Sequence, residues 1–445
     1  MAGSHSNEVL ELLKQLVSYP TINDPLRGSK PSRDVVDFIV DWLSKHGVAA
    51  DVIESSGYYS VYGFVGGGKP CVMLMAHFDV VPVVLEKWQY NPFELTVVGD
   101  RAYGRGALDD KSNVAAIMIA LRELSKKSLE CSVVFALTGD EETGGANGAG
   151  VVAEKLASEG LVPKYLINGD GMGMVVITRR RKAFSVSVSV PASRTRIRGF
   201  VKTVKFTAHY PVSQHAHAAY FIPGVDSHPL IAASVFLREN QCYVKSISGS
   251  FLKSNVIPSE VELEYVVPDP RGEEVEVDLN LTELVKNIMS ISRTPIPIRS
   301  YSDFGVTITP NVYTVSNDKH TVVFDVRAMA LVEDVEKAFT EAIANMLPSA
   351  EVRVKSDPGS YLNTPASSKL VRVFLEVLRE VGLEARISEG AGASDSRYFT
   401  PLGVEAVDFG PRGGNMHGDN EFVEIPSLRA LPSIYVKVVE KLLSS

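Results

Sequence analysis

The sequence predicts an α/β protein in which a mostly parallel sheet carries helices on both faces and is interrupted by an α+β domain. In the first and last parts of the chain, short apolar runs alternate with helical patterns, as in parallel sheets covered by helices. From about residue 178, apolar residues recur at every second position, which is typical of strands with one side in water. We therefore expect a discontinuous first domain, 7–177 plus 361–445, and an inserted domain, 178–360.

Each element of the first domain has its own signal. Apolar residues spaced i, i+3, i+4 and i+7 predict a helix that begins at Val9 and ends before Pro20. Further helices are expected at 33–45, 114–124 and 369–381, the first and last of them followed by a glycine. Short apolar runs predict buried strands at 72–75, 133–137, 165–167 and 406–409.

The inserted domain has a different hydrophobic pattern. Alternation over 184–190 and 260–265 predicts strands with one solvent-facing side, and helical patterns occur near 229–238, 281–289 and 335–346. We expect an antiparallel sheet that carries helices on one side.

The composition excludes several classes of protein. Of the 445 residues, 45% are hydrophobic and 22% charged, and 45 basic against 53 acidic residues give a net charge of −8. These are the values of a globular protein, not of a disordered chain, a collagen or a coiled coil. No apolar stretch is long enough for a membrane span or a signal peptide, so we expect a cytoplasmic protein without a membrane partner. The three cysteines are scattered and odd in number, which favours reduced thiols.

Two short motifs are interpreted as structural. Residues 63–69 have the glycine spacing of a phosphate loop, but Pro70 replaces the required Ser or Thr, so we expect a hairpin turn there. The basic run 179–182 stands in an acidic chain at a domain junction, so we expect a solvated surface and no nucleic-acid partner.

Potential metal ligands follow the apolar runs. His77 and Asp79 follow 72–75, Glu141 and Glu142 follow 133–137, and Asp170 follows 165–167. His417 lies in a glycine-rich loop after 404–409, and a further cluster, 104–111, precedes the helix expected at 114–124. Because ligands of open α/β sheets bind beyond the carboxyl ends of the strands, we expect these side chains to gather at one edge.

The types of donor indicate the kind of metal. Imidazoles and carboxylates without cysteine suit zinc, cobalt or manganese. His77 and Asp79 are two residues apart on an extended segment and point to the same side, so one can bind metal while the other orients its partner. Glu141 and Glu142 are adjacent and face different ways, so one can be a ligand and the other a base, although both could instead be solvated turn residues.

Five motifs in this order resemble the co-catalytic di-zinc exopeptidases and amidohydrolases. That family includes glutamate carboxypeptidase, aminoacylase, acetylornithine deacetylase, succinyl-diaminopimelate desuccinylase and the cytosolic dipeptidases. The motifs are His77-x-Asp79, Gly104-Arg105-Gly106-Ala107-x-Asp109-Asp110-Lys111, Gly139-Asp140-Glu141-Glu142, Asp170, and Gly413-Gly414-Asn415-Met416-His417-Gly418-x-Asn420-Glu421. The resemblance extends over nearly the whole chain, the inserted lid and dimerisation domain included.

The resemblance implies a role for each residue. Asp109 would bridge two divalent metal ions, most often zinc, with His77 and Asp170 on one ion and Glu142 and His417 on the other. Glu141 would be the general base for a metal-bridging hydroxide, Asp79 would support His77, and the Asp109–Asp110 peptide would be cis. The roles implied in the inserted domain are a homodimer in which His217 is donated by the partner, and a lid arginine, Arg327, for a substrate carboxylate.

Several assignments keep alternatives. His215 could take the role of His217, and Arg327 could be a surface residue of the lid. Asn317 is matched only loosely to a family asparagine in the substrate pocket, and Ser394 could support that pocket or cap a turn. Among the resembled enzymes, aspartate at the position of Asp170 is typical of dipeptidases and aminopeptidases, whereas glutamate is typical of deacylases. A small-peptide substrate is therefore favoured over an N-acyl amino acid, and an inactive binding module on the same fold is the remaining alternative.

Overall fold

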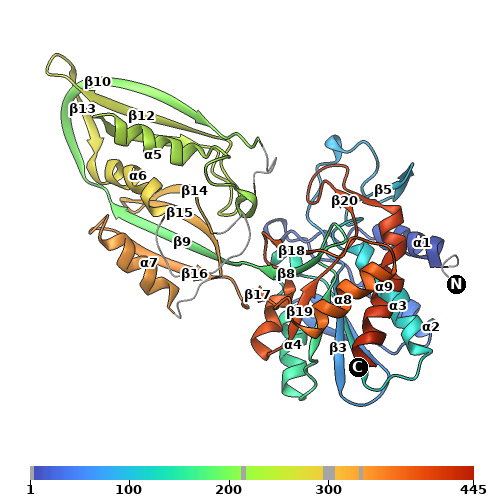
Figure 1. The fold of residues 1–445 in the computed structure, drawn as a ribbon. Coiled ribbons are helices and arrows are strands. Elements are labelled where there is room, and N and C mark those ends of the chain that lie inside the picture. The colour runs from blue at the N-terminus through green and yellow to red at the C-terminus, as the bar shows by residue number, and fades with distance from the viewer. Residues whose placement is uncertain (1–4, 212–216, 294–305, 330–333, 445) are drawn as a thin grey trace. The chain divides into compact units, whose positions relative to one another are not determined.

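The computed structural model describes residues 5–211, 217–293, 306–329 and 334–444 (Figure 1). The chain divides into two compact units, one formed by Met1–Arg180 and Pro358–Ser445 and the other by Arg181–Asp357. We call them unit 1 and unit 2. A mixed, mostly parallel sheet together with separate antiparallel sheets confirms the predicted α/β class.

The main sheet of unit 1 has the strand order β1-β2-β6-β3-β7-β19-β8-β17, with β18 paired to β8. Its four neighbouring strands β6, β3, β7 and β19 run parallel to one another. The bounds are β1 Asp51–Ser55, β2 Tyr58–Val65, β3 Pro70–His77, β6 Ser132–Thr138, β7 Tyr165–Asn168, β8 Val176–Arg180, β17 Leu362–Asn363, β18 Ile387–Gly390 and β19 Glu405–Asp408. The carboxyl ends of the four parallel strands consequently meet at one edge.

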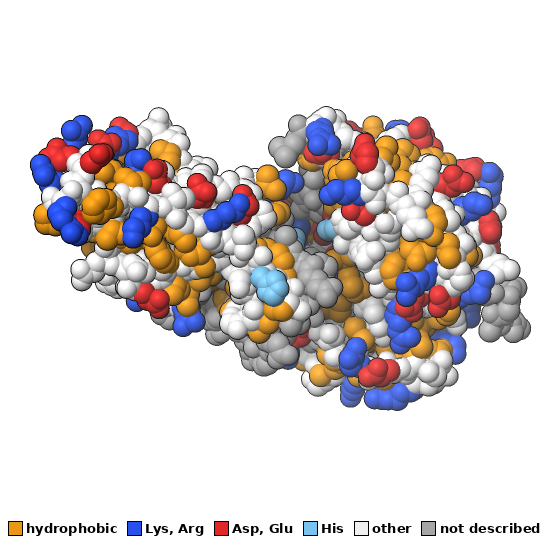
Figure 2. Space-filling model, turned by 90° about the horizontal axis from the view of Figure 1, so that it is seen from above, with side chains coloured by type: hydrophobic (Ala, Val, Ile, Leu, Met, Phe, Trp, Pro, Cys, Tyr) orange, Lys and Arg blue, Asp and Glu red, His pale blue; other side chains and the backbone are white. Residues whose placement is uncertain are grey.

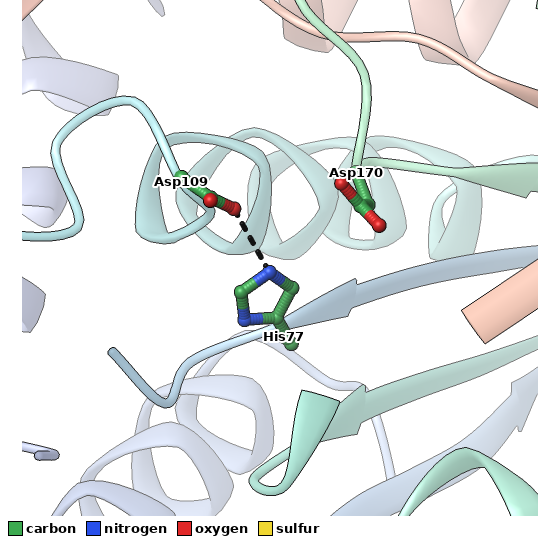
Figure 3. A group of neighbouring side chains, drawn as sticks. All are labelled: His77, Asp109 and Asp170. Carbon is green, nitrogen blue, oxygen red and sulfur yellow. Dashed lines mark hydrogen bonds and ion pairs between the residues drawn. The ribbon is translucent and has the colours of Figure 1, made fainter. Parts of the chain in front are cut away.

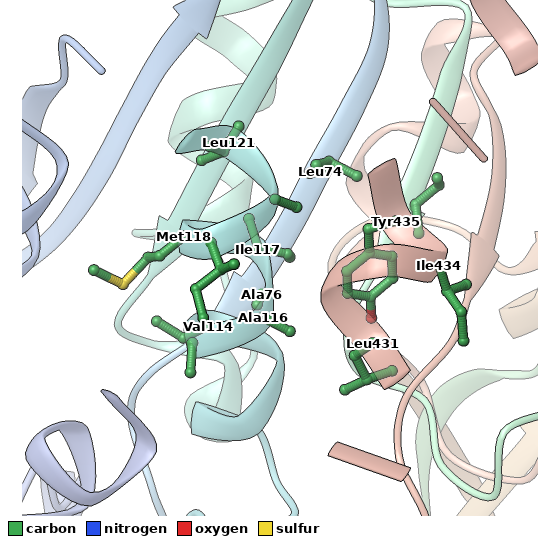
Figure 4. Packing of buried hydrophobic residues seen from close by; sticks show 14 of the residues in the cluster. Leu74, Ala76, Val114, Ala116, Ile117, Met118, Leu121, Leu431, Ile434 and Tyr435 are labelled. Atoms are coloured by element: carbon green, nitrogen blue, oxygen red, sulfur yellow. The ribbon is translucent and has the colours of Figure 1, made fainter. Parts of the chain in front are cut away.

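Helices cover both faces of this sheet because its central strands are apolar on both sides. In β3, Leu74 and Ala76 face one core, and Met73 and Met75 face the other. Figure 4 shows the first core, where α3 and α9 pack beside β3. The helices on that face are α1 His5–Val17, α2 Arg33–Lys45, α3 Lys111–Ser125, α8 Lys369–Glu380 and α9 Ile425–Leu443, and α4 Ala149–Ser158 covers the other. Helix α3 is buried almost all round, as its apolar sequence predicts.

Smaller elements complete unit 1. A second sheet has the order β20-β21-β5-β4, with bounds β4 Thr96–Val98, β5 Arg101–Tyr103, β20 Gly413–Gly414 and β21 Phe422–Glu424. Short 3-10 helices lie at Pro25–Arg27, Leu85–Lys87, Glu141–Thr143, Asp395–Tyr398 and Thr400–Leu402. No helix in the described ranges combines the length and the apolar character needed to cross a bilayer.

The described residues of unit 2 form two antiparallel four-stranded sheets, β11-β12-β10-β13 and β14-β15-β9-β16, where the sequence predicted one. The expectation of a single sheet fails because the consecutive long strands β9 and β10 pair with different partners. The bounds are β9 Lys182–Pro191, β10 Arg194–Thr207, β11 Tyr243–Gly249, β12 Glu260–Pro268, β13 Glu273–Asp278, β14 Thr307–Ser316, β15 Lys319–Ala328 and β16 Glu351–Ser356. The helices are α5 Pro229–Glu239, α6 Leu279–Ile291, α7 Val335–Ala344 and a 3-10 helix at Ala218–Tyr220.

The prediction of three reduced thiols is wrong. Cys71 and Cys131 form a disulfide, with 6.0 Å between their Cα atoms, and Cys242 is free and buried. The two half-cystines are 60 residues apart in the sequence, but β3 and β6 are paired neighbours, which brings their amino-terminal ends together.

The segment after β2 is not a hairpin turn. Strand β6 lies between β2 and β3, so residues 66–69 connect two strands that are not paired with each other. The run of glycines leads the chain past the intervening strand to the start of β3.

Candidate metal centre

Three of the five candidate ligands stand where the parallel strands end. His77 is the last residue of β3, Glu142 lies in the 3-10 helix after β6, and Asp170 lies two residues beyond β7. Asp109 lies two residues before α3, and His417 lies in the loop between β20 and β21. The side chains that were expected to gather at one edge of the sheet therefore lie close together in unit 1.

Three of these side chains form a first group. His77, Asp109 and Asp170 offer ligand atoms that all lie within 4.8 Å of one another. Nε2 of His77 lies 3.0 Å from Oδ1 of Asp109, and the Asp170 carboxylate faces both from the loop after β7 (Figure 3). His77 is buried, at 2% exposure, and the two carboxylates are half-buried.

Asp109 also belongs to a second group, which contains Glu142 and His417. Nε2 of His417 lies 2.9 Å from Oδ2 of Asp109 and 3.2 Å from Oε2 of Glu142. One oxygen of Asp109 therefore faces the first group and the other faces the second. This is the arrangement that a bridging carboxylate needs.

The donors fit two divalent cations. Each group consists of imidazole nitrogen and carboxylate oxygen, the ligands that zinc, cobalt and manganese accept. Oε1 of Glu142 is buried and has no hydrogen-bond partner among the residues described, although a buried carboxylate oxygen ordinarily has one. A cation held by the second group would satisfy this oxygen.

Burial and crowding shift the pKa values of the first group. Burial lowers the pKa of His77, but hydrogen bonds to Asp109 and Asp79 outweigh it and hold the pKa well above 6.5. Burial raises the pKa of Asp170 to about 8, although Arg180 opposes the shift. The pKa of Glu141 is raised well above 4.5 by burial and by the charges of Asp170 and Asp395. A cation would relieve this accumulation of acids.

Metal binding to the first group should weaken as the pH falls through about 8. A metal ion binds carboxylate and neutral imidazole, so below the raised pKa values of Asp170 and His77 it must displace protons. We expect the apparent affinity of this group to fall about tenfold per pH unit for each proton displaced. Calorimetric titration of chelator-stripped protein with the metal is carried out between pH 6 and pH 8.5 in two buffers of different ionisation enthalpy. It measures the metal affinity and the number of protons released. An affinity independent of pH with no proton release would contradict the expectation.

Asp79 joins His77 to the turn that carries Glu141 and Glu142. Its Oδ1 lies 3.4 Å from Nδ1 of His77, which leaves Nε2 facing Asp109. Its carboxylate also accepts hydrogen bonds from the backbone N–H groups of Glu141 and Glu142, each at 3.1 Å. Asn23, which the sequence analysis did not single out, donates to the same carboxylate at 2.8 Å. A single buried aspartate thus orients one imidazole and fixes the turn after β6.

Glu421 and Arg105 hold the loop that contains Asp109. Oε1 of Glu421 accepts hydrogen bonds from the backbone N–H groups of Leu108 (2.8 Å) and Asp109 (3.0 Å). Arg105 forms an ion pair with Glu421 and donates to the carbonyl of Gly418 at 3.0 Å, so the same pair reaches the His417 loop. The cis peptide expected at Asp109–Asp110 is present. Arg105 and Glu421 both belong to the sequence motifs described above. They are far apart in the sequence, and no role was predicted for either of them.

Asn113 and Tyr435 also support the site, although neither was predicted from the sequence to do so. Asn113 donates hydrogen bonds of 2.6 Å to Oδ1 of Asp110 and to the carbonyl of Gly169, and Tyr435 donates to Asn113 at 2.6 Å. Oδ2 of Asp110 accepts from the backbone N–H of His77 at 3.2 Å. The start of α3 is in this way connected to the ends of β3 and β7.

The site residues predicted in the inserted domain lie in unit 2. Nδ1 of His217 accepts a hydrogen bond from the N–H of Ala219 at 3.0 Å, and Nε2 lies 3.4 Å from Nδ2 of Asn255. His215, the alternative to His217, lies outside the described residues. Arg327 is buried and forms two hydrogen bonds of 2.9 Å with Asp325 on the same strand, so it is not the exposed lid residue of the alternative interpretation.

Asn317 occupies the tip of the β14–β15 hairpin. Asn317 and Asp318 both have positive φ angles, 50° and 53°, between the paired residues Ser316 and Lys319. Such two-residue turns favour asparagine and aspartate for backbone reasons, and Asn317 is exposed. The turn geometry by itself explains an asparagine at this position, and the loose match to a substrate-pocket asparagine stays a prediction.

Ser394 is buried immediately before the 3-10 helix Asp395–Tyr398. It precedes that helix as a capping residue would, but its side chain makes no capping hydrogen bond, and its Oγ has no partner among the described residues. Both oxygens of the neighbouring Asp395 likewise lack a hydrogen bond in the described part of the chain. Asp395 interacts electrostatically with His77 and Glu141, so this segment brings these carboxylate oxygens close to the ligand groups.

The basic run 179–182 is not a solvated surface. Arg181 is buried and donates to the carbonyl of Ala219 at 2.8 Å, and the Arg180 side chain is only 11% exposed. Arg179 forms an ion pair with Glu389 at 3.0 Å. Elsewhere, on the face shown in Figure 2, basic and acidic side chains are intermixed. Three consecutive arginines thus take part in internal contacts.

Comparison with known proteins identifies the family. Residues 73–441 match peptidase family M20/M25/M40, and because this range is most of the chain, the chain belongs to that family. The chain is 27% identical over 388 residues to succinyl-diaminopimelate desuccinylase of Gluconobacter oxydans (strain 621H), covering 86% of this chain and 84% of the relative.

Two solved structures have a similar fold. One is aminoacylhistidine dipeptidase from Vibrio alginolyticus, with a TM-score of 0.69, 17% identity and coverage of 98% of this chain and 96% of that one. The other is the M20 family metallo-carboxypeptidase Sso-CP2 from Sulfolobus solfataricus, with a TM-score of 0.63, 16% identity and coverage of 98% and 100%. The family inferred from the motifs is confirmed, and both the peptidase and the deacylase interpretations are compatible with it.

Proposed function

We propose that this protein is a di-zinc exopeptidase of the dipeptidase type, which hydrolyses amide bonds of small peptides. The observation that carries the proposal is the shared carboxylate of Asp109, whose two oxygens face two separate groups of metal ligands. Glu141 lies next to the ligand Glu142 and interacts electrostatically with Asp170 and His77. Zinc is favoured, and cobalt or manganese would suit the same donors.

The roles of the residues follow from their positions. Two bound divalent ions would lower the pKa of a water molecule and polarise the amide carbonyl of the substrate. Glu141 accepts the proton of the attacking water on its carboxylate and returns it to the nitrogen of the leaving amine. Burial and the charges of Asp170 and Asp395 raise the pKa of Glu141 well above 4.5, which is the direction that favours uptake of the proton from water. Asp79 contacts both His77 and the backbone of Glu141, and it thereby fixes the position of the Glu141 turn relative to His77.

The inserted domain would act as lid and dimerisation domain. In this proposal the protein is a homodimer, and His217 of each chain stabilises the oxyanion in the site of the other. Arg327 binds the carboxylate of the peptide, with Asp325 orienting its guanidinium group. A cytoplasmic location belongs to the same proposal and has no support from the cysteines.

A deacylase that removes the acyl group of an N-acyl amino acid is the second candidate. It is favoured by the 27% identity to a succinyl-diaminopimelate desuccinylase. The peptidase is favoured by aspartate at position 170 and by the fold shared with an aminoacylhistidine dipeptidase. Both reactions cleave an amide at the same metal pair, so the substrate pocket decides between them.

A substrate panel separates these candidates. Purified protein with added zinc, cobalt or manganese is given dipeptides, N-acetyl amino acids and N-succinyl amino acids, and release of free amine is measured. We expect turnover of dipeptides. Hydrolysis of the acyl substrates alone would replace the peptidase by the deacylase. Turnover of none of them by protein that holds two metals would favour the binding module.

A further inference from the structure

We propose that Arg180 is a positioning residue that holds Asp170 in place for metal binding. This inference rests on the metal centre proposed above and concerns its first group. The sequence offered no reason to connect the two residues, because Arg180 belongs to a basic run and Asp170 to a glycine-flanked turn.

The contacts of Arg180 bridge neighbouring strands. Arg180 ends β8, Asp408 ends β19, and Asp170 follows β7, in a sheet whose order is β7-β19-β8. Nε of Arg180 donates to Oδ2 of Asp408, and Nη2 donates to the backbone carbonyl of Asp170. The same Nη2 lies 3.4 Å from Oδ1 of Asp170. One guanidinium group thus contacts both the main chain and the carboxylate of the ligand.

Asp408 anchors this guanidinium group. Asp408 has no exposed surface, and its other oxygen accepts a hydrogen bond from Oγ of Ser396 at 2.6 Å. Gly390 leaves room for the arginine, because a Cβ there would lie 3.0 Å from Cγ and 3.1 Å from Cζ of Arg180. The position of Arg180 is therefore set by buried groups that are not themselves candidate ligands.

Asp170 needs such a fixed partner because its own neighbours give it little side-chain support. It is flanked by Gly169 and Gly171, and at both glycines a Cβ would meet a neighbour at 2.5 Å. The glycines allow the loop to pack closely but contribute no side chain that restrains Asp170. The bond from Arg180 to the Asp170 carbonyl supplies that restraint.

Loss of Arg180 should weaken one metal site selectively. Outer partners of metal ligands contribute about 10–100-fold to metal affinity. We expect Arg180→Gln to lower zinc affinity by about that factor in the site formed by His77, Asp109 and Asp170, and to change the other site much less. Arg180→Lys, which keeps the charge but not the forked geometry, should lose less affinity than Arg180→Gln.

The test is competitive zinc titration of the full-length protein with a chelator, combined with absorption spectra of the cobalt-substituted protein. Arg179→Gln is the matched control, because it removes the adjacent arginine and its ion pair with Glu389 but has no contact with Asp170 among those described. We expect wild-type affinities for Arg179→Gln, a selective loss for Arg180→Gln with an altered cobalt spectrum, and an intermediate loss for Arg180→Lys. The lysine variant serves as the test if the glutamine variant does not fold.

Several outcomes would overturn the proposal. These are wild-type affinity and spectrum in both Arg180 variants, or an equal loss at both sites, which a general structural role predicts. A wild-type protein that binds no metal would remove the metal centre and this inference together. A wild-type protein that binds two metals but hydrolyses no substrate would refute the proposed function alone, since the titration still reads the effect of Arg180.

Discussion

Replacing Glu141 with glutamine should lower turnover by about 10³-fold while leaving two metal ions bound. Glutamine is nearly isosteric with glutamate but cannot accept the proton of the attacking water, and general-base catalysis typically contributes 10²–10⁴-fold. Glu141 is not a member of either ligand group, so metal content should be unchanged. Steady-state kinetics on the best substrate of the panel, together with metal analysis of the same sample, measures both effects.

Glu142→Gln is the matched control for this experiment. It makes the same chemical change at the next residue, but it removes a ligand of the second group, so it should lose metal as well as activity. Near-normal turnover by Glu141→Gln would show that the base is misassigned. Loss of metal in that variant would place Glu141 among the ligands.

Replacing Asp109 with asparagine should disable both metal sites in one step. The two groups share this residue, and each of its oxygens faces one of them, so a neutral amide weakens both at once. Because even outer partners of ligands contribute about 10–100-fold, we expect each affinity to fall by more than about 100-fold and activity to become undetectable. Equilibrium dialysis against zinc measures the affinities.

The exposed Asp100→Asn variant supplies the control for Asp109, since it removes the same charge at a residue that belongs to neither ligand group. Selective loss of only one metal in Asp109→Asn would contradict the bridging role. It would indicate two metal sites that do not share Asp109.

Local signals accounted for much of the fold. Helix α2 begins and ends where the sequence predicted, because Ser32 caps its first turn and Gly47 follows its end. The ligand clusters gathered for an equally simple reason. His77, Glu142 and Asp170 follow strands that proved to be parallel neighbours, so the shared direction of these strands brings the three side chains to one edge.

Contacts between distant parts of the sequence were beyond such reasoning. Glu421 lies 316 residues from Arg105, and Asp408 lies 228 residues from Arg180, so nothing local shows that either pair is joined. The disulfide depends in the same way on β3 and β6 being neighbours. The ion pairs made by Glu421 and Asp408 depend on these distant contacts, whereas His77, Glu142 and Asp170 stand at strand ends that local patterns predict.

The stoichiometry of metal binding tests the central claim most directly. Chelator-stripped wild-type protein is dialysed against zinc, and the bound metal per chain is determined while activity is followed on the same samples. We predict two zinc ions per chain, with activity appearing as the sites fill. Full activity in metal-free protein, or a single bound ion at saturation, would contradict a dinuclear site built around Asp109.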